Sequence, residues 1–151
     1  MKILLVEDNF FKREKIVDFI SSTNGHDIIE AASYNSGLTF AMSDEFDLLI
    51  LDMSMPTFDR TDSDMGGRFK VLAGKEIVTK LKKQNRLVPF VIFTGFADFS
   101  VDTDKLNLDQ INDLMALMGE PYKGTIFFDS ANSKWKDDLN NIIASLPESS
   151  Y

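Results

Sequence analysis

The sequence contains no cysteine and only one histidine among its 151 residues. The absence of cysteine excludes disulfides and thiolate metal sites, and it suits a reducing compartment. The single histidine, His26, follows Gly25 in a predicted turn, which argues against catalysis through a histidine. Long apolar runs are also missing. The first run, residues 3–6, is too short for a signal-peptide core or a membrane span. We therefore expect a cytoplasmic protein that does not enter a membrane.

Basic residues are few relative to acidic ones. The chain has 16 lysines and arginines against 24 aspartates and glutamates, which gives a formal net charge of -8. A protein of this charge repels the phosphates of nucleic acids and anionic lipids, so we expect no direct binding to nucleic acid or membrane. Two basic pairs, Lys12 with Arg13 and Lys82 with Lys83, are interpreted as solvent-facing parts of helices.

Short apolar segments alternate with amphipathic ones along the whole chain. Apolar runs that end in polar turns predict strands at residues 2–6, 27–31, 46–52, 88–94 and 125–128. A helix is indicated after each strand by apolar residues at helical spacing, as in Ile16, Phe19 and Ile20. Such alternation implies a parallel sheet that is covered by helices on both faces.

The length of the chain suits one domain. We expect a single domain over residues 1–147, a short C-terminal tail at 148–151 and no output domain. Two polar segments are expected to be loops, namely residues 57–70 and a stretch through Asp98, Asp102 and Asp104.

Polar residues follow the predicted strands at their carboxyl ends, where open parallel sheets bind ligands. Glu7 and Asp8 follow the first strand, Asp52 ends the third, and Thr94 ends the fourth with Gly95 next to it. If the first and third strands are neighbours, three carboxylates converge, and such crowding disfavours their ionisation. A hard divalent cation relieves that conflict, and carboxylate oxygens suit Mg²⁺. Aspartate can also carry phosphate covalently.

Three segments carry a family resemblance when they are read together. Residues 2–9 (KILLVEDN), 49–56 (LILDMSMP) and 91–95 (VIFTG) resemble the signatures of response-regulator receiver domains, in the order of that family. The resemblance spans nearly the whole chain. It implies a flavodoxin-like (CheY-like) doubly wound α/β fold, with a five-stranded parallel sheet in the order 2-1-3-4-5.

The resemblance also implies a Mg²⁺ site. By position, Asp8 matches the carboxylate that binds the metal directly, and Glu7 matches its acidic neighbour. Asp52 matches the phosphorylated aspartate, which is itself a metal ligand. Ser54 matches the residue whose backbone carbonyl binds the metal.

The resemblance further implies roles in binding phosphate. Thr94 matches the switch hydroxyl that moves toward the phosphoryl group on Asp52, and Gly95 matches the small residue that leaves the site open. Hydroxyl and backbone N–H groups are suitable donors to phosphoryl oxygens. The implied partners are a sensor histidine kinase or phosphotransfer protein as the donor, and a downstream protein that receives the signal.

The sequence departs from the family at the end of the fifth strand. Receivers usually have a lysine followed by a proline there, and this chain has Phe128 and Asp129. Lys123 lies at the wrong end of the strand, whereas Lys134, near the last helix, is a possible substitute. Thr125 stands where the family has its aromatic switch residue. A second departure is the long segment 57–70, interpreted as a solvated insertion or alternatively as a docking or lid segment.

Two functions are compatible with these residues, and a third is disfavoured. The first is a stand-alone receiver in a phosphorelay, which is not an enzyme beyond its own phosphorylation and dephosphorylation at Asp52. The alternative is a pseudo-receiver that acts through phosphorylation-independent protein contacts. A Mg²⁺-dependent phosphatase is disfavoured because Ser54 occupies the position where such enzymes have a general acid.

Overall fold

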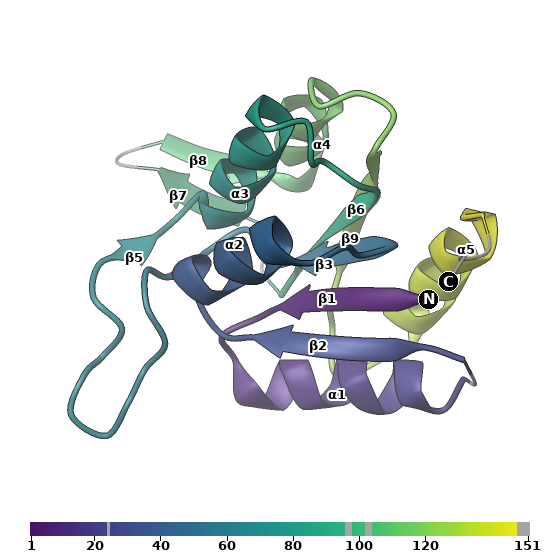
Figure 1. Ribbon diagram of the computed structural model, residues 1–151, viewed down its shortest axis with the longest axis horizontal. Coiled ribbons are helices and arrows are strands. Elements are labelled where there is room, and N and C mark those ends of the chain that lie inside the picture. Colours follow the sequence, from purple (N-terminus) through teal and green to yellow (C-terminus); the bar gives the residue numbers. More distant parts are fainter. Residues whose placement is uncertain (24, 96–97, 102–103, 148–151) are drawn as a thin grey trace.

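The computed structural model describes residues 1–23, 25–95, 98–101 and 104–147 of the chain. Its centre is a five-stranded sheet in the order β2-β1-β3-β6-β9, and every pairing in it is parallel (Figure 1). The strands are β1 (Lys2–Val6), β2 (Asp27–Ala31), β3 (Leu48–Leu51), β6 (Phe90–Thr94) and β9 (Tyr122–Phe127). The order expected from the sequence is confirmed.

Five helices are present in the described part of the chain: α1 (Phe10–Ser21), α2 (Tyr34–Ser43), α3 (Ala73–Lys83), α4 (Leu108–Ala116) and α5 (Lys134–Ser145). Side-chain caps start the first two of them. The Asn9 side chain accepts a hydrogen bond from the Lys12 N–H, and Ser33 forms a reciprocal capping box with Ser36. In the described ranges, no helix combines the length and apolar character needed to span a membrane.

The two faces of the sheet carry separate cores, since successive strand residues point to opposite sides. Leu4 and Leu49 pack on the side of α2, α3 and α4, whereas Ile3 and Ile50 pack on the side of α1 and α5. Because both faces are covered, the central strands read as continuous apolar runs, and residues of β1, β3 and β6 are almost entirely buried.

The expectation of a loop is confirmed for most of the first polar segment, residues 57–68, and it was wrong for the second. Around the first, β4 (Met55–Pro56) pairs with β5 (Phe69–Lys70), and residues 57–68 between them form an arm that extends from the molecule (Figure 1). In the second, β7 (Asp98–Val101) pairs with β8 (Asp104–Asn107) as an antiparallel hairpin. Asp102 and the expected tail, 148–151, lie outside the described residues.

Candidate functional site

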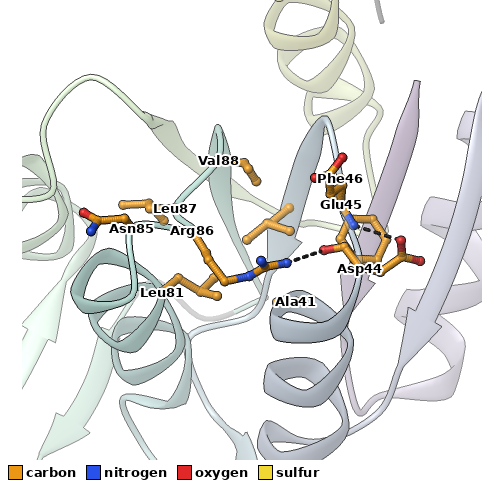
Figure 2. A pocket seen from close by; sticks show the side chains of 10 residues that line it. Ala41, Asp44, Glu45, Phe46, Leu81, Asn85, Arg86, Leu87 and Val88 are labelled. Atoms are coloured by element: carbon orange, nitrogen blue, oxygen red, sulfur yellow. Dashed lines mark hydrogen bonds between the residues drawn. The ribbon is translucent and has the colours of Figure 1, made fainter. Parts of the chain in front are cut away.

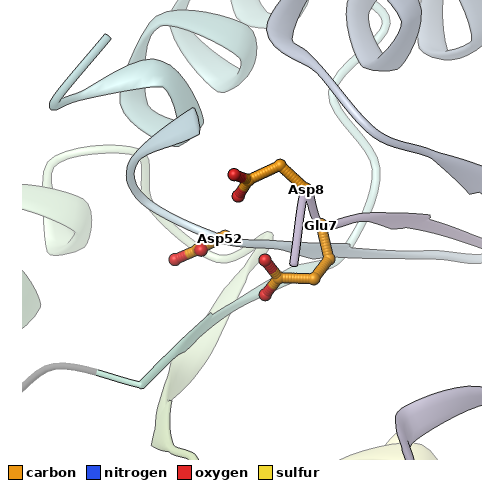
Figure 3. A group of neighbouring side chains, drawn as sticks. All are labelled: Glu7, Asp8 and Asp52. Atoms are coloured by element: carbon orange, nitrogen blue, oxygen red, sulfur yellow. The ribbon is translucent and has the colours of Figure 1, made fainter. Parts of the chain in front are cut away.

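The three acidic residues predicted from the sequence lie together at the carboxyl edge of the sheet. Glu7 and Asp8 follow β1, and Asp52 follows β3, which is the neighbouring strand. The Asp52 N–H donates to the Val6 carbonyl at 3.0 Å, so the two strand ends are held in register. One carboxylate oxygen from each of the three residues lies within 4.8 Å of the others (Figure 3).

These carboxylates line a cleft of about 700 Å³, which is hereafter called the carboxylate cleft. Of the six residues predicted for the site, five line it: Glu7, Asp8, Asp52, Ser54 and Gly95. Thr94, the sixth, is completely buried at the end of β6 and is not part of the lining.

Each carboxylate is already engaged by neighbouring groups. The Asp52 Oδ1 atom accepts the Met53 N–H at 2.7 Å, and the Glu7 Oε2 atom accepts the Asn9 N–H at 3.1 Å. The Asp8 Oδ2 atom pairs with Arg60 Nη1 at 3.1 Å. Arg60 belongs to the arm, so this ion pair joins the arm to the edge of the sheet.

Lys12 is a member of the site that the sequence interpretation missed. Its side chain is buried, with Nζ at 2.5 Å from Glu7 Oε1 and 3.5 Å from Asp52 Oδ2. The same Nζ donates to the Phe93 carbonyl at 2.9 Å. The interpretation of Lys12 and Arg13 as solvent-facing was therefore wrong, since Arg13 also turns inward and donates from Nη1 to the Glu7 carbonyl at 2.8 Å.

The opposite side of the cleft, next to β9, is aromatic. The Phe128 N–H donates to the Thr94 carbonyl at 2.7 Å, and its ring packs against those of Phe93 and Trp135. Phe128 stands where the family resemblance would place a lysine, and the described lining on this side contains no lysine. Lys134, the possible substitute, is not part of the cleft lining, and its side chain is 83% exposed and lies near Asp138.

Comparisons with known proteins identify the family of this chain. The family model described as "Response regulator receiver domain" matches residues 3–115. The chain belongs to the response-regulator receiver family. It is 30% identical to the Detocs response regulatory protein DtcB of Enterobacter cloacae, over 97% of this chain and 100% of that protein. It is 29% identical to the uncharacterized protein y4jR of Sinorhizobium fredii, over 97% and 99%.

Solved receiver structures show the same fold. The response regulator TrrA of Thermotoga maritima, in complex with Mg²⁺ and BeF, has a TM-score of 0.62 at 18% identity, with 93% of this chain and 97% of that chain covered. The CheX–CheY–BeF₃–Mg²⁺ complex of Borrelia burgdorferi gives a TM-score of 0.65 at 14% identity, with 96% and 87% covered. At these identities the likeness concerns the fold.

The donor set of this receiver suits the Mg²⁺ that receivers typically bind. Burial raises the pKa of Glu7 to about 8, the nearby Asp52 charge adds to that rise, and Lys12 opposes it. Burial likewise raises the pKa of Asp52, again against the effect of Lys12. The buried carboxyls thus resist full ionisation, and a hard cation that accepts oxygen ligands would remove this penalty.

Gly74 sets the distance between α3 and the end of β3. Its N–H donates to the Met53 carbonyl at 2.9 Å, and a Cβ at this position would lie 2.6 Å from the Asp52 carbonyl oxygen. Only a glycine therefore allows the helix to approach the end of β3 this closely.

A smaller cavity of about 270 Å³ lies between the ends of α2 and α3 and the starts of β3 and β6 (Figure 2). There, Arg86 Nη2 donates to the Asp44 carbonyl at 3.2 Å. The cavity contains none of the residues predicted from the sequence, and its lining lacks a convergent group of carboxylates. The carboxylate cleft is therefore the better candidate for function.

Proposed function

We propose that this receiver acts as a stand-alone module of a two-component phosphorelay and accepts a phosphoryl group on Asp52. The observation that carries the proposal is the position of Asp52 at the end of β3, within 4.8 Å of Glu7 and Asp8. Its Oδ1 atom is engaged by the Met53 N–H, which leaves Oδ2 as the oxygen that attacks phosphorus. Membership of the receiver family and the full coverage of DtcB support this function.

Four residues would hold the metal in this proposal. The carboxylates of Glu7, Asp8 and Asp52 and the backbone carbonyl of Ser54 provide oxygen ligands of the kind that Mg²⁺ prefers. When bound, Mg²⁺ supplies positive charge that stabilises the transferring phosphoryl group.

The end of β6 would supply donors for the phosphoryl oxygens. Thr94, with its hydroxyl, ends the strand next to β3, and Gly95 follows it on the cleft lining. A Cβ added at Gly95 would meet no atom within 4 Å, so there is open space for a ligand beside this position. These are the donor types that suit an oxyanion.

The phosphoryl donor in this proposal is a sensor histidine kinase or a phosphotransfer protein, and the output is a contact with a downstream protein in the cytoplasm. Residues 1–147 act as one signalling unit, which turns over no substrate other than its own Asp52. Phosphate adds charge at one end of the sheet, and such a local change can bias binding elsewhere on the domain.

The test is phosphorylation by a small donor. The protein is incubated with Mg²⁺ and acetyl phosphate or phosphoramidate, and its intact mass is measured. A phosphoryl adduct is expected in the wild type, and it is expected to be absent in Asp52→Asn and in the presence of EDTA. An adduct of equal yield in Asp52→Asn would overturn the assignment of the phosphoacceptor.

A pseudo-receiver is the second candidate, and Phe128 is the observation that favours it. This ring fills the place of the family's ammonium and is fixed by Phe93 and Trp135. A pseudo-receiver keeps the fold and acts through constitutive protein contacts. It predicts no adduct from either donor in the presence of Mg²⁺, so the same mass measurement separates the two functions.

A further inference from the structure

Lys12 is a charged residue at a position of α1 where the other buried side chains are apolar. Its side chain is only 8% exposed and lies on the same face of α1 as Ile16 and Ile20. Burial of an ammonium is unfavourable unless charged or polar partners compensate for the lost water. Lys12 has three such partners, and two of them are the carboxylates of Glu7 and Asp52.

These three contacts place the ammonium beside the proposed phosphoacceptor. Glu7 follows β1, Phe93 belongs to β6, and Asp52 follows β3, which lies between those two strands. The Nζ atom is 3.5 Å from Oδ2 of Asp52, the oxygen that is not engaged by the Met53 N–H. A group that joins Oδ2 therefore enters the immediate surroundings of this ammonium.

Other cations are scarce in the described lining of the cleft. The lining contains one further basic residue, Arg60, and its side chain is 45% exposed and bonded to Asp8. The β9 side presents Phe127, Phe128 and Asp129, of which two are apolar and one repels phosphate. Lys12 is thus the buried cation of the cleft.

We infer that Lys12 is the catalytic cation of this receiver: its ammonium binds an oxygen of the phosphoryl group during transfer to Asp52, from α1 rather than from β9. The inference rests on the proposed function. In this structure the same ammonium lies beside both Glu7 and Asp52. With a divalent cation as the counter-ion of those carboxylates, Lys12 would be available to the phosphoryl group.

The transfer step can be written for acetyl phosphate. The Asp52 Oδ2 atom forms a bond to phosphorus, the bond between phosphorus and the acetyl oxygen breaks, and acetate leaves with the electron pair. No oxidant, reductant or added proton is needed. Negative charge spreads over the phosphoryl oxygens in the transition state, and a preorganised donor such as Lys12 stabilises it.

The experiment measures the rate of adduct formation with acetyl phosphate at saturating Mg²⁺. Lys12→Met is expected to slow phosphorylation on the order of 100-fold, the typical cost of removing one oxyanion donor. Lys12→Arg keeps a cation at the site and is expected to recover most of that loss. The control is Lys15→Met on the same helix, because Lys15 is exposed and lies over the Phe11 ring.

A second readout is independent of phosphorylation. Calorimetric titration with Mg²⁺ is expected to show about tenfold tighter binding to Lys12→Met than to the wild type, because a positive charge no longer opposes the ion. Lys12→Gln, which keeps a polar group near Glu7, serves in both assays if Lys12→Met does not fold. Circular dichroism checks the fold of each variant.

The outcomes separate this inference from the function on which it rests. Phosphorylation of folded Lys12→Met or Lys12→Gln at the wild-type rate overturns the role of Lys12 and leaves Asp52 as the acceptor. The absence of an adduct on the wild type overturns both. Slow phosphorylation of the neutral variants, with recovery in Lys12→Arg and no change in Lys15→Met, supports the inference.

Discussion

The α1 flank of the carboxylate cleft (residues 9–13) and its β9 flank (residues 127–130) face the same acids with different side chains. On the α1 flank, Lys12 and Arg13 bind Glu7 through its carboxylate and its carbonyl. On the β9 flank, Phe128 packs against Phe93 and Trp135 within the core beneath α1 and α5.

Charge compensation and aromatic packing therefore come from separate flanks of the cleft. In the described part of the cleft, the cations come from α1 and from the arm, and the β9 flank contributes rings and Asp129. Changes on the β9 flank should therefore act mainly on stability, and changes on the α1 flank mainly on ion binding. Four further measurements test this division between the flanks.

The largest effect is expected from Trp135→Ala. Trp135 is 3% exposed and contacts the rings of Phe19, Phe93 and Phe128. Its loss leaves a cavity, and we expect a decrease of about 3–5 kcal/mol in the free energy of unfolding, measured by urea denaturation. The control Phe127→Ala, at a side chain that is 38% exposed, should cost under about 1 kcal/mol. Equal costs would contradict an aromatic core on this flank.

Gly74→Ala is expected to have the next largest effect. The new Cβ would meet the Asp52 carbonyl oxygen at 2.6 Å and the Met53 Cα at 3.3 Å, so the end of β3 must shift. We expect a loss of about 1–3 kcal/mol in stability, together with weaker Mg²⁺ binding in a calorimetric titration. Gly95→Ala is the control, because a Cβ there meets nothing within 4 Å. If Gly95→Ala were the more harmful change, the close approach of α3 would not matter.

The pH dependence of stability tests the α1 flank in the metal-free protein. A carboxyl whose pKa rises on folding stabilises the native state at low pH, and this contribution is lost as the pH rises through the folded pKa. For Glu7, whose pKa rises from 4.5 to about 8, the loss falls between these values. With EDTA present, urea unfolding should show a decrease of at least about 1 kcal/mol across that window. Glu7→Gln should flatten the decrease, and a parallel decrease in this variant would assign it to other groups.

The smallest effect is expected from Arg60→Ala, which removes the contact between the arm and Asp8. The pair is partly exposed, and such pairs contribute under about 1 kcal/mol. Because Arg60 competes with a cation for Asp8, Mg²⁺ binding should become up to about fivefold tighter in a calorimetric titration. Arg68→Ala, at an exposed position on the arm, provides the control. Weaker binding to Arg60→Ala would mean that Arg60 supports the metal site.

The sheet and its acidic edge could be predicted because their signals are local. The run from Ile3 to Val6 ends in Glu7 and Asp8, and the run from Leu48 to Leu51 ends in Asp52. Both strands are buried on two faces, so they read as continuous apolar runs that end in acids. The hairpin of β7 and β8 was not predicted, since Asp98 and Asp104 made its segment resemble a polar loop.

Lys12 could have been found from helical spacing. Lys12, Ile16 and Ile20 are four residues apart, and all three are buried on one face of α1. From the sequence, Lys12 is nevertheless interpreted as solvent-facing, because lysine is rarely buried without a partner. The sequence predicts its partner, Glu7, as a metal ligand, so the pairing of the two residues is visible only in the three-dimensional structure.

The short distance along the chain between Lys12 and Glu7 has a consequence for the order of folding. Only five positions separate them, whereas Phe128 lies at the far end of the chain. Contacts of low sequence separation close small loops and form early, and contacts between distant segments wait for the rest of the fold. The counter-ion of Glu7 can therefore be in place once β1 and the first turn of α1 have met, so the buried acid need not wait for β9 to join the sheet.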